Sequence, residues 1–157
     1  MSKAIVDYTI HINIEGEYDI DEEGIRAAAW HALSAARAGA PSALTVTLTS
    51  ADHIRRLNRQ FAGLDEETDV LSFGTDGGPY LVDPGEPPYL GDVVIAVPVA
   101  EKQAAEMCHS LLAELQMLTI HGVLHLLGFD HATPEEQAEM WTYESEARNA
   151  LRPGKEI

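Results

Sequence analysis

Three histidines fall within an otherwise apolar run, Thr119 to His131, which reads TIHGVLHLLGFDH. His121 and His125 are four residues apart, so on a helix they lie on one face, one turn apart. Gly128 lets the chain leave the helix with a positive φ, after which His131 can fold back over the helix end. Three neutral imidazoles with an open fourth position are typical of a catalytic zinc site, in which bound water has a pKa of about 7. The spacing therefore predicts one zinc ion held by His121, His125 and His131.

The same spacing leaves alternatives open. It fits the zincin protease pattern H-E-x-x-H-x-x-G-x-x-H except at Gly122, where those proteases carry the glutamate that serves as general base. A glycine cannot accept a proton from metal-bound water, so the peptidase interpretation loses its central catalytic group. Asp130, just before His131, could orient a ligand or cap the turn. Three imidazoles also accept nickel, copper or iron.

Hydrophobic periodicity indicates the elements that must position these residues. Strand patterns cover residues 4–14, 42–50, 69–74 and 90–97. Helical patterns cover residues 19–40, 51–63, 99–127 (broken near Cys108) and 132–151. Ser50 and Thr133 are expected to cap helix starts, and Gly63 to close a helix. The sequence predicts one α+β domain over residues 1–152, a mixed four-stranded sheet packed with about five helices, followed by a frayed tail at 153–157.

Composition and charge limit the expected binding partners and the expected cellular compartment. The formal net charge of −16 argues against DNA and against generic binding to phosphate backbones. Arg55, Arg56 and Arg59 nevertheless cluster, as a solvated helix face or as a small basic site. Cys108 is the single cysteine, no secretory signal is visible, and no apolar run approaches the roughly 20 residues that span a bilayer. We expect a soluble cytoplasmic protein with no membrane partner.

The histidine motif and four further blocks resemble the YbeY family, bacterial metal-dependent endoribonucleases also called rRNA maturation factors. The blocks follow the family's order: TDVLSFG at 68–74, LGDVVIAV at 90–97, HSLLAEL at 109–115 and EMWTYESEARNAL at 139–151. The resemblance implies zinc at the three histidines and cleavage of single-stranded RNA. It also implies maturation of the 3′ end of 16S rRNA, and a part in ribosome assembly and quality control. Ribosomal RNA and the small ribosomal subunit are the implied partners.

The chain lacks arginine at two positions where the family has it or often has it. Ala62 stands where the family carries an arginine in the pattern N-x-x-[YF]-R-x-x-D-x-P-T-D, and Ala113 stands at another position where arginine is frequent. That arginine is expected to contact a phosphate and stabilise developing charge. Arg59, one helical turn earlier, could substitute for it, as could Arg55 or Arg56. The departure keeps a second function open, that of a ribosome-assembly factor with weak or lost cleavage, besides a zinc hydrolase of another substrate.

The general base must also come from elsewhere, because position 122 is a glycine. Besides the zinc-activated water itself, the candidates are Glu114 and His109. Glu114 precedes His121 by two helical turns on the same face, although it could equally be an exposed salt-bridge partner. His109 matches the family's histidine but could simply pack against the neighbouring loop. Arg59, His109 and Glu114 are thus the candidate catalytic residues.

Overall fold

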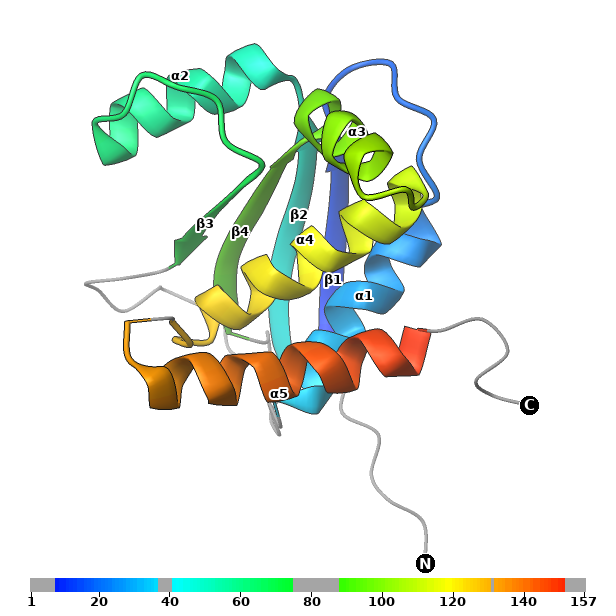
Figure 1. Ribbon diagram of the computed structural model, residues 1–157, viewed down its shortest axis with the longest axis vertical. Helices are drawn as coiled ribbons and strands as arrows, with labels where there is room; N and C mark the ends of the chain where they lie inside the picture. The colour runs from blue at the N-terminus through cyan, green and yellow to red at the C-terminus, as the bar shows by residue number, and fades with distance from the viewer. Residues whose placement is uncertain (1–7, 37–40, 75–87, 131, 152–157) are drawn as a thin grey trace, which may run out of the picture.

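Four strands form one mixed sheet in the order β1-β2-β4-β3 (Figure 1). The computed structural model describes residues 8–36, 41–74, 88–130 and 132–151. The strands are β1 (Tyr8–Ile14), β2 (Ser42–Thr49), β3 (Val70–Gly74) and β4 (Tyr89–Ala96). The first three strands in the sheet order are mutually parallel, whereas β3 pairs with β4 in the antiparallel direction. This leaves β3 at the edge of the sheet, beside the helix that carries the histidines.

Five helices cover the two faces of the sheet unequally. They are α1 (Glu22–Ala35), α2 (Ala51–Ala62), α3 (Val97–Glu106), α4 (Leu111–Leu126) and α5 (Pro134–Leu151). Side chains of β4 alternate between two cores: Val93 and Ile95 belong to the main core, and Val94 and Ala96 to a smaller core with Ile54 of α2. Helix α2 therefore covers the face of the sheet opposite to the main core. Figure 1 shows α4 crossing the main-core face of the sheet. Helix α5 runs past the end of α4 that carries His121 and His125.

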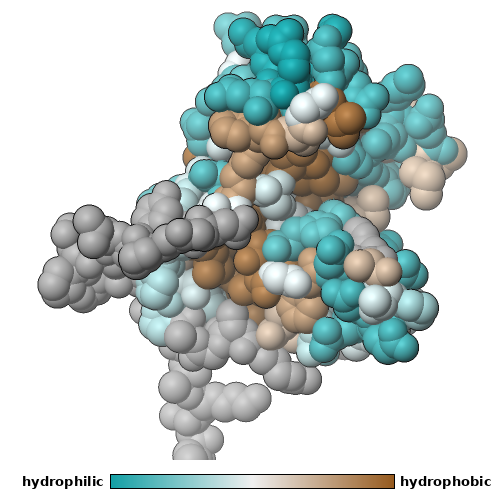
Figure 2. Space-filling model, turned by 90° about the vertical axis from the view of Figure 1, so that its left-hand side faces the viewer, coloured by the Kyte–Doolittle hydropathy of each residue, from teal (hydrophilic) through white to brown (hydrophobic). Residues whose placement is uncertain are grey.

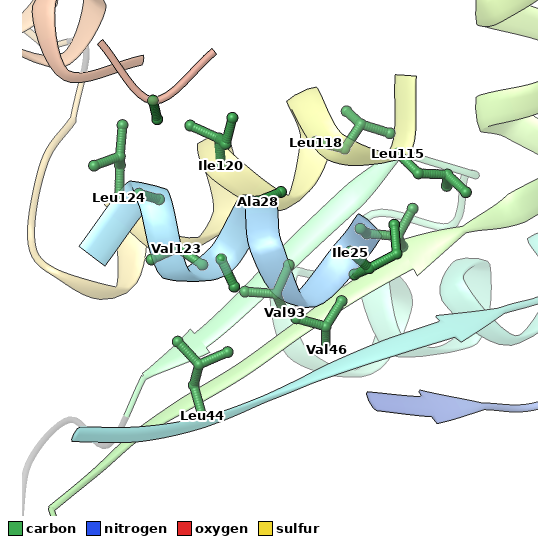
Figure 3. Packing of buried hydrophobic residues seen from close by; sticks show 14 of the residues in the cluster. Ile25, Ala28, Leu44, Val46, Val93, Leu115, Leu118, Ile120, Val123 and Leu124 are labelled. Carbon is green, nitrogen blue, oxygen red and sulfur yellow. The ribbon is translucent and has the colours of Figure 1, made fainter. Parts of the chain in front are cut away.

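The main core fixes the position of α4. Figure 3 shows side chains of α1, α4 and the sheet packed together. The labelled members are Ile25 and Ala28 from α1, Leu44, Val46 and Val93 from the sheet, and Leu115, Leu118, Ile120, Val123 and Leu124 from α4. Ala28, Ala29 and Ala32 are fully buried, and their small side chains allow α1 to approach its neighbours closely. The apolar face of α4 is thereby anchored in the core, and His121 and His125 lie on a less buried face of the helix.

The predicted fold class is confirmed: the chain is a single α+β domain with a mixed four-stranded sheet and, among the described residues, five helices. The predicted caps are confirmed as well. Ser50 accepts a hydrogen bond from His53 N, Thr133 accepts one from Glu136 N, and Gly63 closes α2 in the left-handed conformation. The predicted break separates α3 from α4, where Cys108 has a φ of 57°. The tail at 153–157 lies outside the described residues, and the domain limits stay a prediction.

Burial in β2 is greater than its alternating sequence indicated. Leu44, Val46 and Leu48 are fully buried as expected, but Thr47 and Thr49 on the other face are buried too. The reason is the central position of β2 between β1 and β4, together with polar partners for the threonine face. The Oγ1 of Thr49 lies 3.0 Å from Oε1 of Glu15 and 2.9 Å from Nδ1 of His53.

Candidate metal centre

Two of the three predicted ligands lie together on the last turns of α4. The Nε2 atoms of His121 and His125 are 3.0 Å apart, and the ring centroids are 4.5 Å apart. Two nitrogens that bind one tetrahedral zinc at about 2.0–2.1 Å are roughly 3.3 Å from each other. The donor pair therefore fits a shared metal ion. The third predicted ligand, His131, lies outside the described residues, and within those residues no group of three His, Cys, Asp or Glu side chains could hold an ion.

The helix ends directly after this pair, as the glycine predicted. Gly128 has a φ of 99°, and its N–H donates to His125 O at 3.0 Å. The N–H of Phe129 donates to Leu124 O at 3.1 Å, and the two bonds together form a Schellman motif at the end of the helix. The Phe129 ring packs against Tyr143 of α5 at a centroid distance of 5.1 Å. The turn that leads to His131 is thus tied to α5.

Glu144 of α5 contacts the first histidine and was not found by the sequence reasoning. Its Oε2 lies 3.0 Å from Nδ1 of His121, across 23 residues of chain. The side chains of Glu144 and His121 are 24% and 29% exposed, so the contact is partly shielded from water. Helix α5 carries several other acidic residues, and nothing in their spacing distinguishes Glu144. The only available signal was that the segment around it resembles the closing block of the family.

A cleft of about 520 Å³ opens beside the histidine pair, along the edge strand. Its lining is Asp69, Val70, Leu71, Ser72, Gly74, His121, His125, Leu126 and Gly128. Asp69 and Ser72 line the cleft, and the Oγ of Ser72 donates to the backbone oxygen of Gly122 at 2.9 Å. Figure 2 shows this side of the molecule, where apolar surface lies between more polar regions. The histidines form one wall of the cleft and β3 forms the other.

Gly122 is a packing requirement as well as a missing base. A Cβ atom at this position would lie 2.5 Å from Cγ1 of Val93 and 3.3 Å from Oγ of Ser72. Real Cβ atoms essentially never come as close as 2.5 Å to another atom, so Val93 or the helix would have to shift, whereas the 3.3 Å contact with Ser72 needs only a small adjustment. The glycine lets α4 approach β4 and β3 closely, and the same contact leaves no room for the zincin glutamate.

His109 and Glu114 lie at the other end of α4. Nε2 of His109 is 2.5 Å from Oε1 of Glu114, whose side chain is only 3% exposed. The interpretation of Glu114 as an exposed salt-bridge partner is therefore wrong, because this carboxylate is buried. Seven residues separate Glu114 from His121, a rise of about 10 Å along the helix axis. Neither residue is among those that line the cleft, and their role as a general base stays a prediction.

The arginine cluster lies on α2, on the far side of the sheet from α4. All three arginines are exposed, as expected for a solvated helix face. Arg55 binds Asp65 through two hydrogen bonds of 2.8 and 3.3 Å, and these bonds lower the pKa of the Asp65 carboxyl below its usual value. Arg56 lies 3.5 Å from Asp52. Arg59 does not line the histidine cleft, and its phosphate contact stays a prediction.

Fold and site together define the class: a single-domain α+β protein with a histidine-lined cleft beside an edge strand. The family model described as Endoribonuclease YbeY matches residues 11–152. The chain belongs to the YbeY family of endoribonucleases.

Individual relatives agree with this assignment. The chain is 42% identical over 147 residues to the Endoribonuclease YbeY of Chloroflexus aurantiacus, covering 92% of this chain and 96% of the relative. It is 42% identical over 144 residues to that of Salinispora tropica, covering 87% and 92%. The solution structure of TM1509 from Thermotoga maritima superposes with a TM-score of 0.59 at 26% identity, covering 95% of this chain and 96% of that one. None of the helices in the described residues combines the length and apolarity needed to cross a bilayer.

Proposed function

We propose that the protein is a zinc-dependent endoribonuclease specific for single-stranded RNA. It would mature the 3′ end of 16S rRNA and act in ribosome assembly and quality control in the cytoplasm. Membership of an endoribonuclease family supports an RNA-cleaving hydrolase with RNA as its substrate. The observation that carries the zinc proposal is the 3.0 Å separation of the His121 and His125 Nε2 atoms at the wall of an open cleft.

His121 and His125, with His131 as the predicted third ligand, would hold the zinc ion. Zinc bound there supplies a Lewis acid and lowers the pKa of a coordinated water to about 7. Both histidines must present Nε2 lone pairs to the metal, and the contact with Glu144 favours a proton on Nδ1 of His121, which leaves the Nε2 of that ring for the metal. The cleft volume falls within the range of small-ligand sites, about 300–1,000 Å³.

The residues that would handle protons and phosphate charge remain proposals. A general base acts over roughly 2.6–3.2 Å or through one water, whereas Glu114 lies about 10 Å along α4 from His121. His109 is engaged with the same carboxylate. Arg59 is the proposed phosphate contact in place of the arginine absent at Ala62, and within the described residues it has no ion-pair partner.

Purified protein can test this proposal with zinc analysis and a single-stranded RNA that contains the 3′ end of 16S rRNA. We expect one zinc per chain, cleavage of the single strand, no cleavage of a matching duplex, and loss of cleavage in His121→Ala. Cleavage that persists in His121→Ala or in metal-free protein would overturn the zinc mechanism. Turnover of casein with inert RNA would instead indicate a hydrolase of another substrate.

A second candidate, a ribosome-assembly factor with weak or lost cleavage, is favoured by one observation. Ala62 removes the guanidinium of the family pattern, and Arg59 does not line the histidine cleft. Binding to small ribosomal subunits without metal-dependent cleavage of the single-stranded RNA would support this function. Binding together with cleavage would support the endoribonuclease.

A further inference from the structure

The contact between Glu144 and His121 determines which imidazole nitrogen carries a proton. An ionised carboxylate can only accept hydrogen bonds, so the 3.0 Å contact between Glu144 Oε2 and His121 Nδ1 requires a proton on Nδ1. The neutral ring then keeps its lone pair on Nε2. That atom lies on the side of the ring that faces His125, 3.0 Å from the second Nε2. The glutamate thus selects the tautomer that a metal ligand needs.

The position of Glu144 is fixed by its own helix. Met140 and Ala147 are 2% and 1% exposed, and they precede and follow Glu144 by one helical turn on the buried face of α5. Tyr143 packs on Phe129, which belongs to the turn after α4. The carboxylate is therefore held beside His121 by core packing and does not depend on a flexible surface side chain.

We propose that Glu144 is a positioning residue for the metal centre, acting through His121. The inference rests on the proposed zinc site and adds a residue from a different helix to it. A carboxylate that receives the second ring N–H of a histidine ligand orients the ring and raises its basicity, and loss of such a partner typically lowers metal affinity about 10- to 100-fold. We expect that range for removal of the Glu144 carboxylate.

Three variants of the full chain separate positioning from a general effect on charge or folding. Glu144→Ala removes the acceptor, whereas Glu144→Gln keeps an amide oxygen that can still accept from Nδ1–H. Glu146→Ala is the matched control, because Glu146 is an exposed acidic residue on the same helix. Circular dichroism would verify that each variant is folded.

The first measurement uses metal-free protein with nitrogen-15 in its histidines, and reads the His121 tautomer from its long-range proton–nitrogen spectrum. We expect Nδ1–H in the wild type, in Glu144→Gln and in Glu146→Ala, and a shift towards Nε2–H in Glu144→Ala. The second measurement is zinc affinity by competition with a chelator. We expect a 10- to 100-fold loss in Glu144→Ala, rescue to within a few-fold in Glu144→Gln, and no change in Glu146→Ala.

An unchanged tautomer, or a zinc affinity within twofold of wild type, in Glu144→Ala would overturn the inference. An equal loss in Glu146→Ala would also overturn it, because the effect would then be one of net charge. A wild-type protein that binds no zinc would overturn the proposed function and this inference together. Zinc binding with the expected variant effects but without RNA cleavage would overturn the proposed function alone and support the inference.

Discussion

A histidine–glutamate pair lies at each end of α4, and the two pairs differ in their surroundings. At the start of the helix, Nε2 of His109 meets Oε1 of Glu114 at 2.5 Å, and the carboxylate is buried. At the end of the helix, Nδ1 of His121 meets Oε2 of Glu144 at 3.0 Å; both side chains are partly exposed, and His121 lines a cleft. The same two residue types thus build a contact with a buried carboxylate at one end and a candidate ligand site at the other.

Two differences separate the pairs. His109 and Glu114 are five residues apart and connect the start of α4 to the turn that precedes it, whereas His121 and Glu144 join two helices. The second difference is the ring nitrogen that the glutamate contacts. At the end of α4 the contact at Nδ1 leaves Nε2 beside a second imidazole. The second imidazole beside Nε2 is the feature that makes the pair at the end of α4 a candidate metal centre.

Removal of a ligand should give the largest effect. We expect His125→Ala to lose stoichiometric zinc and to reduce cleavage of single-stranded RNA by more than about 100-fold, because two imidazoles hold zinc far more weakly than three. Zinc content and initial cleavage rates would measure this. His109→Ala is the matched variant at the other end of α4 and should keep its zinc. Equal loss of zinc in both variants would contradict the division between the two ends.

The middle of α4, which lies between the two pairs, should be the next most sensitive position. Gly122→Glu would restore the zincin pattern, but its Cβ would lie 2.5 Å from Val93 Cγ1. We expect a loss of about 3 kcal/mol or more in the free energy of unfolding, from overpacking together with burial of a charge, and no peptidase activity. Urea titration and casein turnover would measure these.

Gly122→Ala is a milder test at the same position, with an expected loss of about 1 kcal/mol because gained helix propensity offsets part of the clash. Gly128→Ala is its control: no atom of the described residues lies within 4 Å of the added Cβ, so the cost of the φ of 99° should dominate the measurement. A Gly122→Glu protein as stable as wild type would show that α4 can move away from the sheet.

Glu114→Gln tests the pair at the start of α4, in which the carboxylate is buried. We expect the free energy of unfolding to fall by about 1–2 kcal/mol, because a charge-assisted hydrogen bond in a buried setting becomes a weaker one. Urea titration would measure this loss, and zinc competition should give an unchanged affinity. An unchanged stability combined with a more than 100-fold loss of cleavage in zinc-loaded protein would instead support Glu114 as the general base.

Arg59→Ala should give the smallest effect, since this exposed side chain lies away from both pairs. If Arg59 contacts one phosphate, the slope of log affinity against log salt for single-stranded RNA should become shallower by about 0.7. Lys102→Ala, on exposed α3 surface, changes the net charge equally and is the control. Identical slopes for the two variants would remove Arg59 from the RNA contact and strengthen the assembly-factor alternative.

Local sequence signals predicted much of the fold and part of the site. The caps at Ser50 and Thr133, the stop at Gly63 and the break at Cys108 depend on residues within a few positions of one another, so they could be read directly. Burial was harder to predict. The threonine face of β2 is buried because distant elements cover it. The carboxylate of Glu114 is buried, and it contacts His109 in the turn before α4.

The sequence by itself determined that His121 and His125 face the same way, because a spacing of four residues places two side chains on one face of any α-helix. It also determined that the helix ends at Gly128. The tertiary structure alone decided that Glu144 contacts Nδ1 of His121 and that a side chain at position 122 would collide with Val93. The physical reason is that both features depend on how α4 packs against α5 and the sheet, and such packing is set by the whole core.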